Sequence, residues 1–154
     1  MPKGEGVKLI ASNRKARHRY QILETVEAGL SLLGTEVKAL REGKASIGEA
    51  FVRPVDGELF LVGMNIPTYS SAGYSQHEPT RPRKLLLRSK QIHSLTGQIL
   101  QKGHSMVPLR LYFKRGYAKA ELALVRGKKM RDKREDLKRR QEERDAARHM
   151  GRRR

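Results

Sequence analysis

The side chains with the clearest chemistry lie in a short basic segment, residues 13–20, which reads Asn-Arg-Lys-Ala-Arg-His-Arg-Tyr. Its cations suit RNA phosphates, and its amide, imidazole and phenol groups suit base edges and faces. Two further basic clusters follow later in the chain. They comprise Arg81, Arg83, Lys84, Arg88 and Lys90, and then Lys114, Arg115 and Lys119. All three clusters predict contact with a polyanion, although charge alone does not rank them.

The sequence gives no pattern for catalysis or metal binding. Gly43-Lys44-Ala45 lacks the upstream glycine and the hydroxyl of a phosphate-binding loop. The chain has no cysteine, and its histidines lack the spacing of a zinc site. These histidines are His18, His77, His93, His104 and His149. We therefore expect no enzyme activity, no metal and no cofactor. The enzymatic alternative is a nuclease with unrecognised acids, which predicts magnesium-dependent cleavage of RNA.

The chain of 154 residues carries 34 Lys and Arg against 16 Asp and Glu, a formal net charge of +18. A compact monomer with this charge repels itself unless an anionic partner neutralises it. RNA, DNA and an acidic membrane surface all qualify, but no apolar run approaches the length of about 18 to 20 residues that spans a membrane. The N-terminus also lacks the apolar region of a signal peptide. We therefore expect a soluble cytoplasmic protein that binds nucleic acid and has no membrane partner.

The composition changes after Arg126, where apolar residues nearly vanish. Residues 127–154 contain 13 Lys and Arg against 6 Asp and Glu, a net charge of +7, which leaves +11 on residues 1–126. This division predicts an RNA-binding β-barrel domain over residues 1–126 and a basic C-terminal tail over residues 127–154. The tail has high helix propensity but no broad apolar face. We expect it to be disordered when free and helical on a charged surface.

Apolar runs and turn residues predict a mainly β fold. Residues 20–27 predict a strand, with a turn at Gly29 and a second apolar run after it. Two hairpins are expected, around Asp56-Gly57 and around residues 114–116, because glycine readily takes the positive φ of such turns. With about five strands and few helices, the expected fold class is a small antiparallel barrel of the oligonucleotide-binding type with short flanking helices.

Two helices and one long loop are expected between these strands. Thr35 is placed to cap a short helix over residues 36–41, and Ser89 to cap a longer one that extends to Gln101. Three prolines between residues 65 and 83 exclude a helix or a central strand there. The longer helix carries an apolar stripe that should face the core. The stripe comprises Ile92, Leu95, Ile99 and Leu100.

Six blocks of the sequence occur in the order typical of one family. They are residues 13–18, 27–30, 34–38, 81–87, 111–114 and 127–134. On these blocks the chain resembles the SmpB family of SsrA-binding proteins. The resemblance implies binding to the tRNA-like domain of transfer-messenger RNA (tmRNA, or SsrA RNA) and its delivery to stalled ribosomes in trans-translation. It also implies elongation factor Tu with alanyl-tmRNA and the decoding centre of 16S rRNA as partners.

The basic segment and the resemblance together mark a set of RNA-binding residues. They are Asn13, Arg14, Lys15, Arg17, His18, Glu27, Leu86, Arg88 and Lys119. The family that the chain resembles often has a different residue at the position of Arg88. An acid such as Glu27 suits an RNA interface if it orients neighbouring cations or accepts hydrogen bonds from base or ribose donors. The alternative for Glu27 is a structural ion pair at a strand edge.

The resemblance assigns the tail to the ribosome, where the segment is expected to become helical in the empty mRNA channel and to probe the decoding centre. The matching residues are Gly127, Lys128, Lys129, Arg131, Asp132, Lys133 and Arg134. Arg131 stands where the family commonly has histidine, and arginine also stacks on bases. A constitutive ribosomal protein is the structural alternative. It would sediment with all ribosomes rather than with stalled ones.

Overall fold

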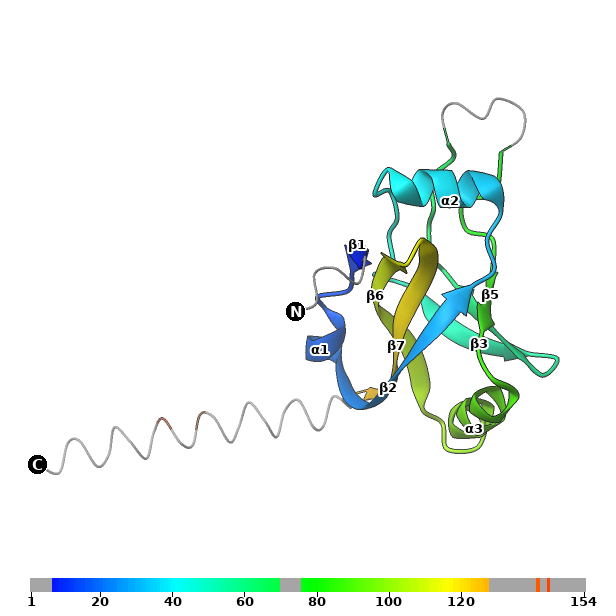
Figure 1. The fold of residues 1–154 in the computed structure, drawn as a ribbon. Coiled ribbons are helices and arrows are strands. Elements are labelled where there is room, and N and C mark those ends of the chain that lie inside the picture. Colours follow the sequence, from blue (N-terminus) through cyan, green and yellow to red (C-terminus); the bar gives the residue numbers. More distant parts are fainter. Residues whose placement is uncertain (1–6, 70–75, 128–140, 142–143, 145–154) are drawn as a thin grey trace, which may run out of the picture.

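The computed structural model describes residues 7–69 and 76–127, together with residues 141 and 144. Within these residues, seven strands form one antiparallel sheet in the order β1-β6-β7-β2-β5-β4-β3 (Figure 1). The strands are β1 (Lys8–Ser12), β2 (Tyr20–Leu30), β3 (Phe51–Val55), β4 (Glu58–Val62), β5 (Arg83–Leu86), β6 (Ser105–Lys114) and β7 (Tyr117–Gly127). The described helices are α1 (Ala16–Arg19), α2 (Gly34–Arg41) and α3 (Ser89–Leu100), and α2 and α3 lie at opposite ends of the sheet.

Both predicted hairpins are confirmed. Asp56 and Gly57 join β3 to β4 with φ angles of 49° and 79°, and Arg115 and Gly116 join β6 to β7 with 53° and 84°. Two successive positive φ angles characterise the type I′ turn, whose twist matches that of the flanking strands. These local turns set the register of the two hairpins and therefore decide which side chains share a face.

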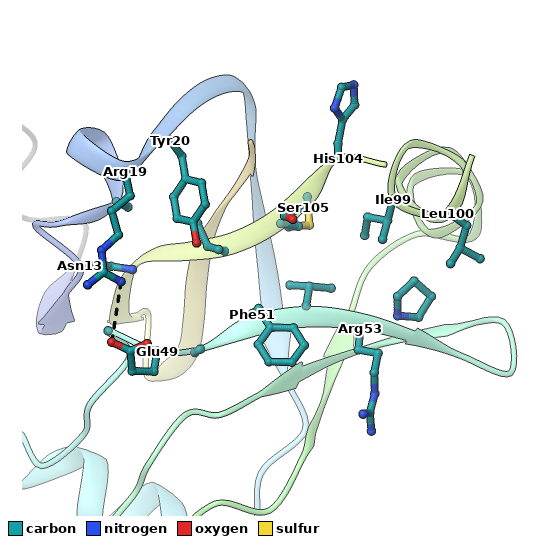
Figure 2. A pocket seen from close by; sticks show the side chains of 17 residues that line it. Asn13, Arg19, Tyr20, Glu49, Phe51, Arg53, Ile99, Leu100, His104 and Ser105 are labelled. Atoms are coloured by element: carbon teal, nitrogen blue, oxygen red, sulfur yellow. Dashed lines mark ion pairs between the residues drawn. The ribbon is translucent and has the colours of Figure 1, made fainter. Parts of the chain in front are cut away.

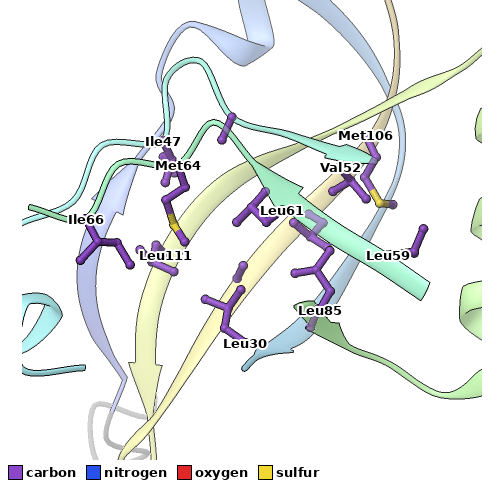
Figure 3. Packing of buried hydrophobic residues seen from close by; sticks show 14 of the residues in the cluster. Leu30, Ile47, Val52, Leu59, Leu61, Met64, Ile66, Leu85, Met106 and Leu111 are labelled. Atoms are coloured by element: carbon purple, nitrogen blue, oxygen red, sulfur yellow. The ribbon is translucent and has the colours of Figure 1, made fainter. Parts of the chain in front are cut away.

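The main hydrophobic core collects side chains from β2 through β7 (Figure 3). Leu61, Leu85, Leu111 and Leu122 come from four different strands and are completely buried. Burial of one such leucine stabilises the fold by about 1.5 to 3 kcal/mol. This core defines the inner face of the sheet, and the opposite side is its outer face.

A second, smaller cluster lies on the other side of β6 and β7 and anchors α1 there. It comprises Ala16, Val107, Leu109, Ala123 and Val125. Ala16 is 1% exposed although α1 is only four residues long. Since so short a helix has little stability of its own, this contact holds the basic segment in place against the sheet.

The predicted mainly β, antiparallel fold with short flanking helices is confirmed. The seven strands exceed the five or so that the apolar runs predict and fall within the six to eight that the family resemblance implies. β1 and β5 were not predicted, because each is short and carries polar residues among its apolar ones. The strand ladder is open: β1 and β3 are its edges, and β3 lies close to β6 without pairing to it. The strands therefore do not close into a hydrogen-bonded barrel.

The predicted turn at Gly29 is wrong. Gly29 lies inside β2, where it is paired with Lys119 of β7 on one side and with Leu86 of β5 on the other. A Cβ atom at this position would lie 3.2 Å from the Cβ of Leu86. Glycine is therefore used here for the close approach of β5, which is its other common role within strands.

The predicted helix cap at Thr35 is also wrong. α2 begins at Gly34, and the amide of Leu33 donates to Glu36 Oε1 at 2.7 Å. The hydroxyl of Thr35 is instead hydrogen-bonded to Nδ1 of His77, at 2.9 Å. The buried carboxylate of Glu36 thus stabilises the free amide at the start of the helix, a role that sequence reasoning gave to Thr35.

The second predicted helix is confirmed, with two differences. α3 begins at Ser89, but Arg88 occupies the cap position, where its amide donates to Gln91 Oε1 at 3.2 Å. Leu95 is buried, and Ile92 and Ile99 pack against the core. Leu100 is 68% exposed, so its assignment to the core-facing stripe is wrong. It lies at the last position of the helix.

A buried ion cluster connects α2, β5 and the loop that precedes β5. Glu36 and Arg83 are both 0% exposed. Arg83 donates to Glu36 Oε2 at 2.6 Å and to the Met64 carbonyl at 2.7 Å, and Arg81 donates to Glu36 Oε1 at 2.6 Å. The expectation that Arg83 faces a polyanion is therefore wrong, because its guanidinium is enclosed by protein acceptors.

Among the residues that the structure describes, no helix has the length and the apolar character needed to span a bilayer.

Candidate RNA-binding surface

Strand pairing places residues from distant parts of the sequence in one row across the outer face of the sheet. The row crosses five strands, from β1 to β5, and each member is paired with the next. It runs Leu9, Tyr112, Lys119, Gly29 and Leu86. Leu9 and Leu86 are 56% and 52% exposed. Two of the predicted RNA-binding residues, Lys119 and Leu86, therefore lie on the same face.

A second row, adjacent to the first, consists of Arg110, Glu121 and Glu27. Arg110 donates to both carboxylate oxygens of Glu121, at 3.2 and 3.1 Å. The guanidinium of Arg110 also lies 5.3 Å from the ring centre of Tyr112 in the neighbouring row. The two rows thus form one connected surface of cations, carboxylates and exposed leucines around the ring of Tyr112, which is only 5% exposed; we call it the outer surface.

Glu27 is held by two residues of β6. The hydroxyl of Tyr112 donates to Glu27 Oε2 through a short hydrogen bond, and Lys114 Nζ lies 3.5 Å from the same oxygen. Glu27 therefore forms an ion pair with Lys114, as its structural alternative predicted, although β2 is an internal strand and not an edge of the sheet. The same contacts place Lys114 and Tyr112 beside the carboxylate, so a role of the acid in orienting these neighbours stays a prediction.

The electrostatics of this contact keep the carboxylate ionised and the phenol protonated. The hydrogen bond from Tyr112 lowers the pKa of Glu27, burial partly opposes this, and Lys114 and Lys119 lower it further. Burial, together with the adjacent Glu27 carboxylate, raises the pKa of the Tyr112 phenol. At neutral pH the outer surface therefore presents fixed charges, with no group in this contact poised to change its protonation state.

We expect Tyr112→Phe to raise the pKa of Glu27 toward its ordinary value, because the largest stabilising contact to the carboxylate is lost. An NMR titration of the Glu27 carboxyl carbon measures this shift. Tyr117→Phe is the matched control, since Tyr117 lies on the same hairpin but is 71% exposed. An unchanged titration midpoint in Tyr112→Phe would contradict the role of the hydroxyl.

The basic segment lies beside the second row. The backbone amide of Asn13 donates to the Leu109 carbonyl at 2.8 Å, and its side-chain amide donates to the Pro108 carbonyl at 3.2 Å. Asn13 therefore fastens the segment to β6. Arg14 and Arg17 line a groove of about 570 Å³. The groove is shared with Ser12, Asn13, Leu109, Arg110 and Glu121.

The other predicted residues lie around this surface. Lys15 and His18 are exposed, next to and within α1. Arg88 is exposed at the start of α3, two residues after Leu86. Gly127 is the last residue of β7 and is paired with Tyr20. The remaining tail residues of the prediction lie outside the described residues; they are Lys128, Lys129, Arg131, Asp132, Lys133 and Arg134.

Sequence reasoning missed Arg110, Tyr112 and Glu121 as members of the surface. Arg110 and Glu121 each stand between buried residues on the last hairpin, whereas Tyr112 is itself only 5% exposed. The hairpin register, read from the Arg115-Gly116 turn, could have placed Tyr112 opposite Lys119. The irregularity between Pro108 and Arg110 makes the pairing of Arg110 harder to predict. In the part of the chain that the structure describes, no three His, Asp or Glu residues are grouped so that they could hold a metal ion.

A family model described as SmpB protein matches residues 10–152 of the chain. The chain belongs to the SmpB family. An SsrA-binding protein of Solidesulfovibrio magneticus is 53% identical over 150 residues, which cover 97% of each chain. One of Corynebacterium urealyticum is 54% identical over 151 residues, which cover 98% of this chain and 85% of the relative. The family assignment from six sequence blocks is thus confirmed over nearly the whole chain.

A solved SmpB structure shares the fold. It is described as "tmRNA-SmpB: a journey to the center of the bacterial ribosome". The similarity has a TM-score of 0.65 at 50% sequence identity, and it covers 78% of this chain and 85% of the other. The structural similarity therefore agrees with the family assignment.

Proposed function

We propose that this SmpB-family protein binds the tRNA-like domain of tmRNA and delivers it to stalled ribosomes for trans-translation. The observation that carries the proposal is the pairing of Tyr112, Lys119, Gly29 and Leu86 in one row, with Glu27 hydrogen-bonded to that row by Tyr112. Residues that the family resemblance marked separately thus share one exposed face. Membership of the SmpB family and a structural relative described with tmRNA and the ribosome support the same function.

In this proposal the outer surface and the basic segment contact different parts of the RNA. Lys119, Lys114 and Arg110 supply cations to phosphates, and the exposed Leu86 and Leu9 supply apolar contacts to ribose or base faces. Arg14, Lys15, Arg17 and His18 extend the contact along the groove beside β6. The carboxylates of Glu27 and Glu121 hold the cations in fixed positions, so that the surface recognises the shape of a folded RNA and not charge density alone.

The proposed role of the tail, residues 127–154, is to enter the empty mRNA channel as a helix and to report its vacancy to the decoding centre. Its net charge of +7 suits a channel lined by ribosomal RNA. Elongation factor Tu would bring the alanyl-tmRNA complex to the ribosome. The protein would then act in the cytoplasm as an adaptor without chemistry of its own, and residues 1–126 would form its RNA-binding domain.

Glu27→Ala should weaken binding of the tRNA-like domain about tenfold, because Tyr112 and Lys114 lose the acceptor that positions them. Filter binding or gel shift at one fixed salt concentration measures the change. The direction of the change in affinity is informative. Removal of a negative charge raises the net charge of the protein and would by itself strengthen binding to any polyanion.

Glu24→Ala is the matched control. Glu24 is exposed on the same strand, and its pairing partner Leu124 belongs to the main core, which places Glu24 on the opposite side from Glu27. We expect Glu24→Ala to bind the RNA as well as the parent does, or slightly more tightly. If both variants behaved alike, the outer surface would not be the binding face.

A further inference from the structure

A groove on a different part of the molecule lies between β3 and the start of β6 (Figure 2). It has a volume of about 630 Å³, within the range of about 300 to 1,000 Å³ that is usual for small-molecule sites. The residues that matter here are Arg19, Tyr20, Phe51, Arg53 and His104. We call it the β3–β6 groove.

The groove follows from the open strand ladder. β3 is an edge strand that lies close to β6 without pairing to it, so side chains and not backbone hydrogen bonds fill the space between the two strands. Phe51, at the start of β3, remains 44% exposed. Tyr20 is partly buried against the small cluster beneath α1 and points from the start of β2 toward β3. Two aromatic side chains thus line one hollow.

The charges around these rings favour an anion. In Figure 2, Arg19 and Arg53 lie on either side of Phe51. Glu49 is the one acidic residue of the lining, and it lies 3.7 Å from Arg19. That pair is weak, because its side chains are 44% and 84% exposed. A phosphate can therefore replace Glu49 as the partner of Arg19 at little cost.

We propose that the β3–β6 groove binds one unpaired nucleotide of single-stranded RNA, with the base against Phe51 and Tyr20 and the flanking phosphates at Arg19 and Arg53. Aromatic rings beside cations are the usual arrangement for unpaired bases, since every base has a face that can stack. The site goes beyond the proposed function, which uses the outer surface for a folded RNA domain. Asn13 lines both the β3–β6 groove and the groove of Arg14 and Arg17, so the two contacts adjoin at the basic segment.

The test uses the absence of tryptophan from the chain. Phe51→Trp in the full-length protein creates a single fluorescent reporter in the groove. Addition of the hexanucleotide rA6 should quench it with saturation, and rA6 should bind more tightly than rU6 because purines stack more strongly. Tyr20→Leu in the same background should weaken rA6 binding about tenfold. Leu33→Trp, 47% exposed in the parent at the start of α2, is the control and should show no saturable quenching.

Two results would overturn the proposal: a Phe51→Trp signal that rA6 leaves unchanged, or equal quenching in Leu33→Trp. A second measurement avoids dependence on the variant. Cross-linking of 4-thiouridine hexanucleotide to the unaltered protein should label the peptides that contain Phe51 or Tyr20, and labelling confined to other peptides would reject the site.

Phe51→Ala should retain full affinity for the tRNA-like domain. Failure of the parent to bind that domain would instead contradict the proposed function.

Discussion

Truncation after Gly127 is expected to leave the affinity for the tRNA-like domain nearly unchanged and to abolish peptide tagging of stalled nascent chains. Gly127, the last residue of β7, is paired with Tyr20 of β2, and the cut comes after it. The sheet and both rows of the outer surface therefore remain. The truncation removes a net charge of +7 from the chain. Gel shift measures the first property, and a tagging assay on ribosomes with truncated mRNA measures the second.

A control is needed because the tail is so basic. Replacement of residues 128–154 by the same residues in shuffled order keeps the charge and the composition. If the tail acts through a specific helix in the mRNA channel, the shuffled protein should bind ribosomes with the parent's salt dependence but should fail in tagging. Normal tagging by the truncated or the shuffled protein would contradict the proposed role of the tail.

The second large effect concerns stability. Arg83→Ala should lower the free energy of unfolding by about 3 to 5 kcal/mol, because it leaves the completely buried Glu36 with one of its two cationic partners removed. The Met64 and Pro79 carbonyls also lose their donor. Urea denaturation measures the difference. Arg110→Ala is the control for loss of an ion pair on the exposed surface, and it should cost less than about 1 kcal/mol.

The pH dependence of the difference in unfolding free energy between the parent and Arg83→Ala gives an independent check. Burial acts to raise the pKa of Glu36, but the hydrogen bonds from Arg81, the Leu33 amide and Arg83 outweigh it, so the pKa is lowered in the folded protein. The cluster therefore stabilises the fold above the unfolded pKa of about 4.3. This contribution is lost as the pH falls through the lower folded value. The gap between parent and Arg83→Ala should shrink on acidification, and a constant gap would assign the loss to packing alone.

The parts of the fold that sequence could predict are those with local causes. Asp56-Gly57 and Arg115-Gly116 form the expected turns, since positive φ is a property of the turn residues themselves. β5 and the place of Gly29 could not be predicted in the same way. The four residues of β5 form a strand only because β2 and β4 pair with it, and Gly29 lies within β2 because Leu86 approaches it closely.

The candidate site shows the same division. The basic segment and Lys119 could be identified from charge, but charge also suggested Arg83, which the fold buries beside Glu36. The number of Lys and Arg in a segment does not distinguish a cation that faces solvent from one that is buried and donates to an acid and to backbone carbonyls, as Arg83 does. Tyr112 was missed for the opposite reason, because its contribution is a single hydroxyl aimed at Glu27 across the intervening strand.

The carboxylates on the outer surface have a consequence for the kinetics of RNA binding. Long-range attraction depends on the whole charge of +18 and sets how fast any RNA is captured at a given salt concentration. The pairs Arg110–Glu121 and Lys114–Glu27 are locally compensated, so they add little to that attraction. Their geometry acts only after contact, through the rate of dissociation. Capture speed and complex lifetime are thus encoded in different residues, and selection can change one without the other.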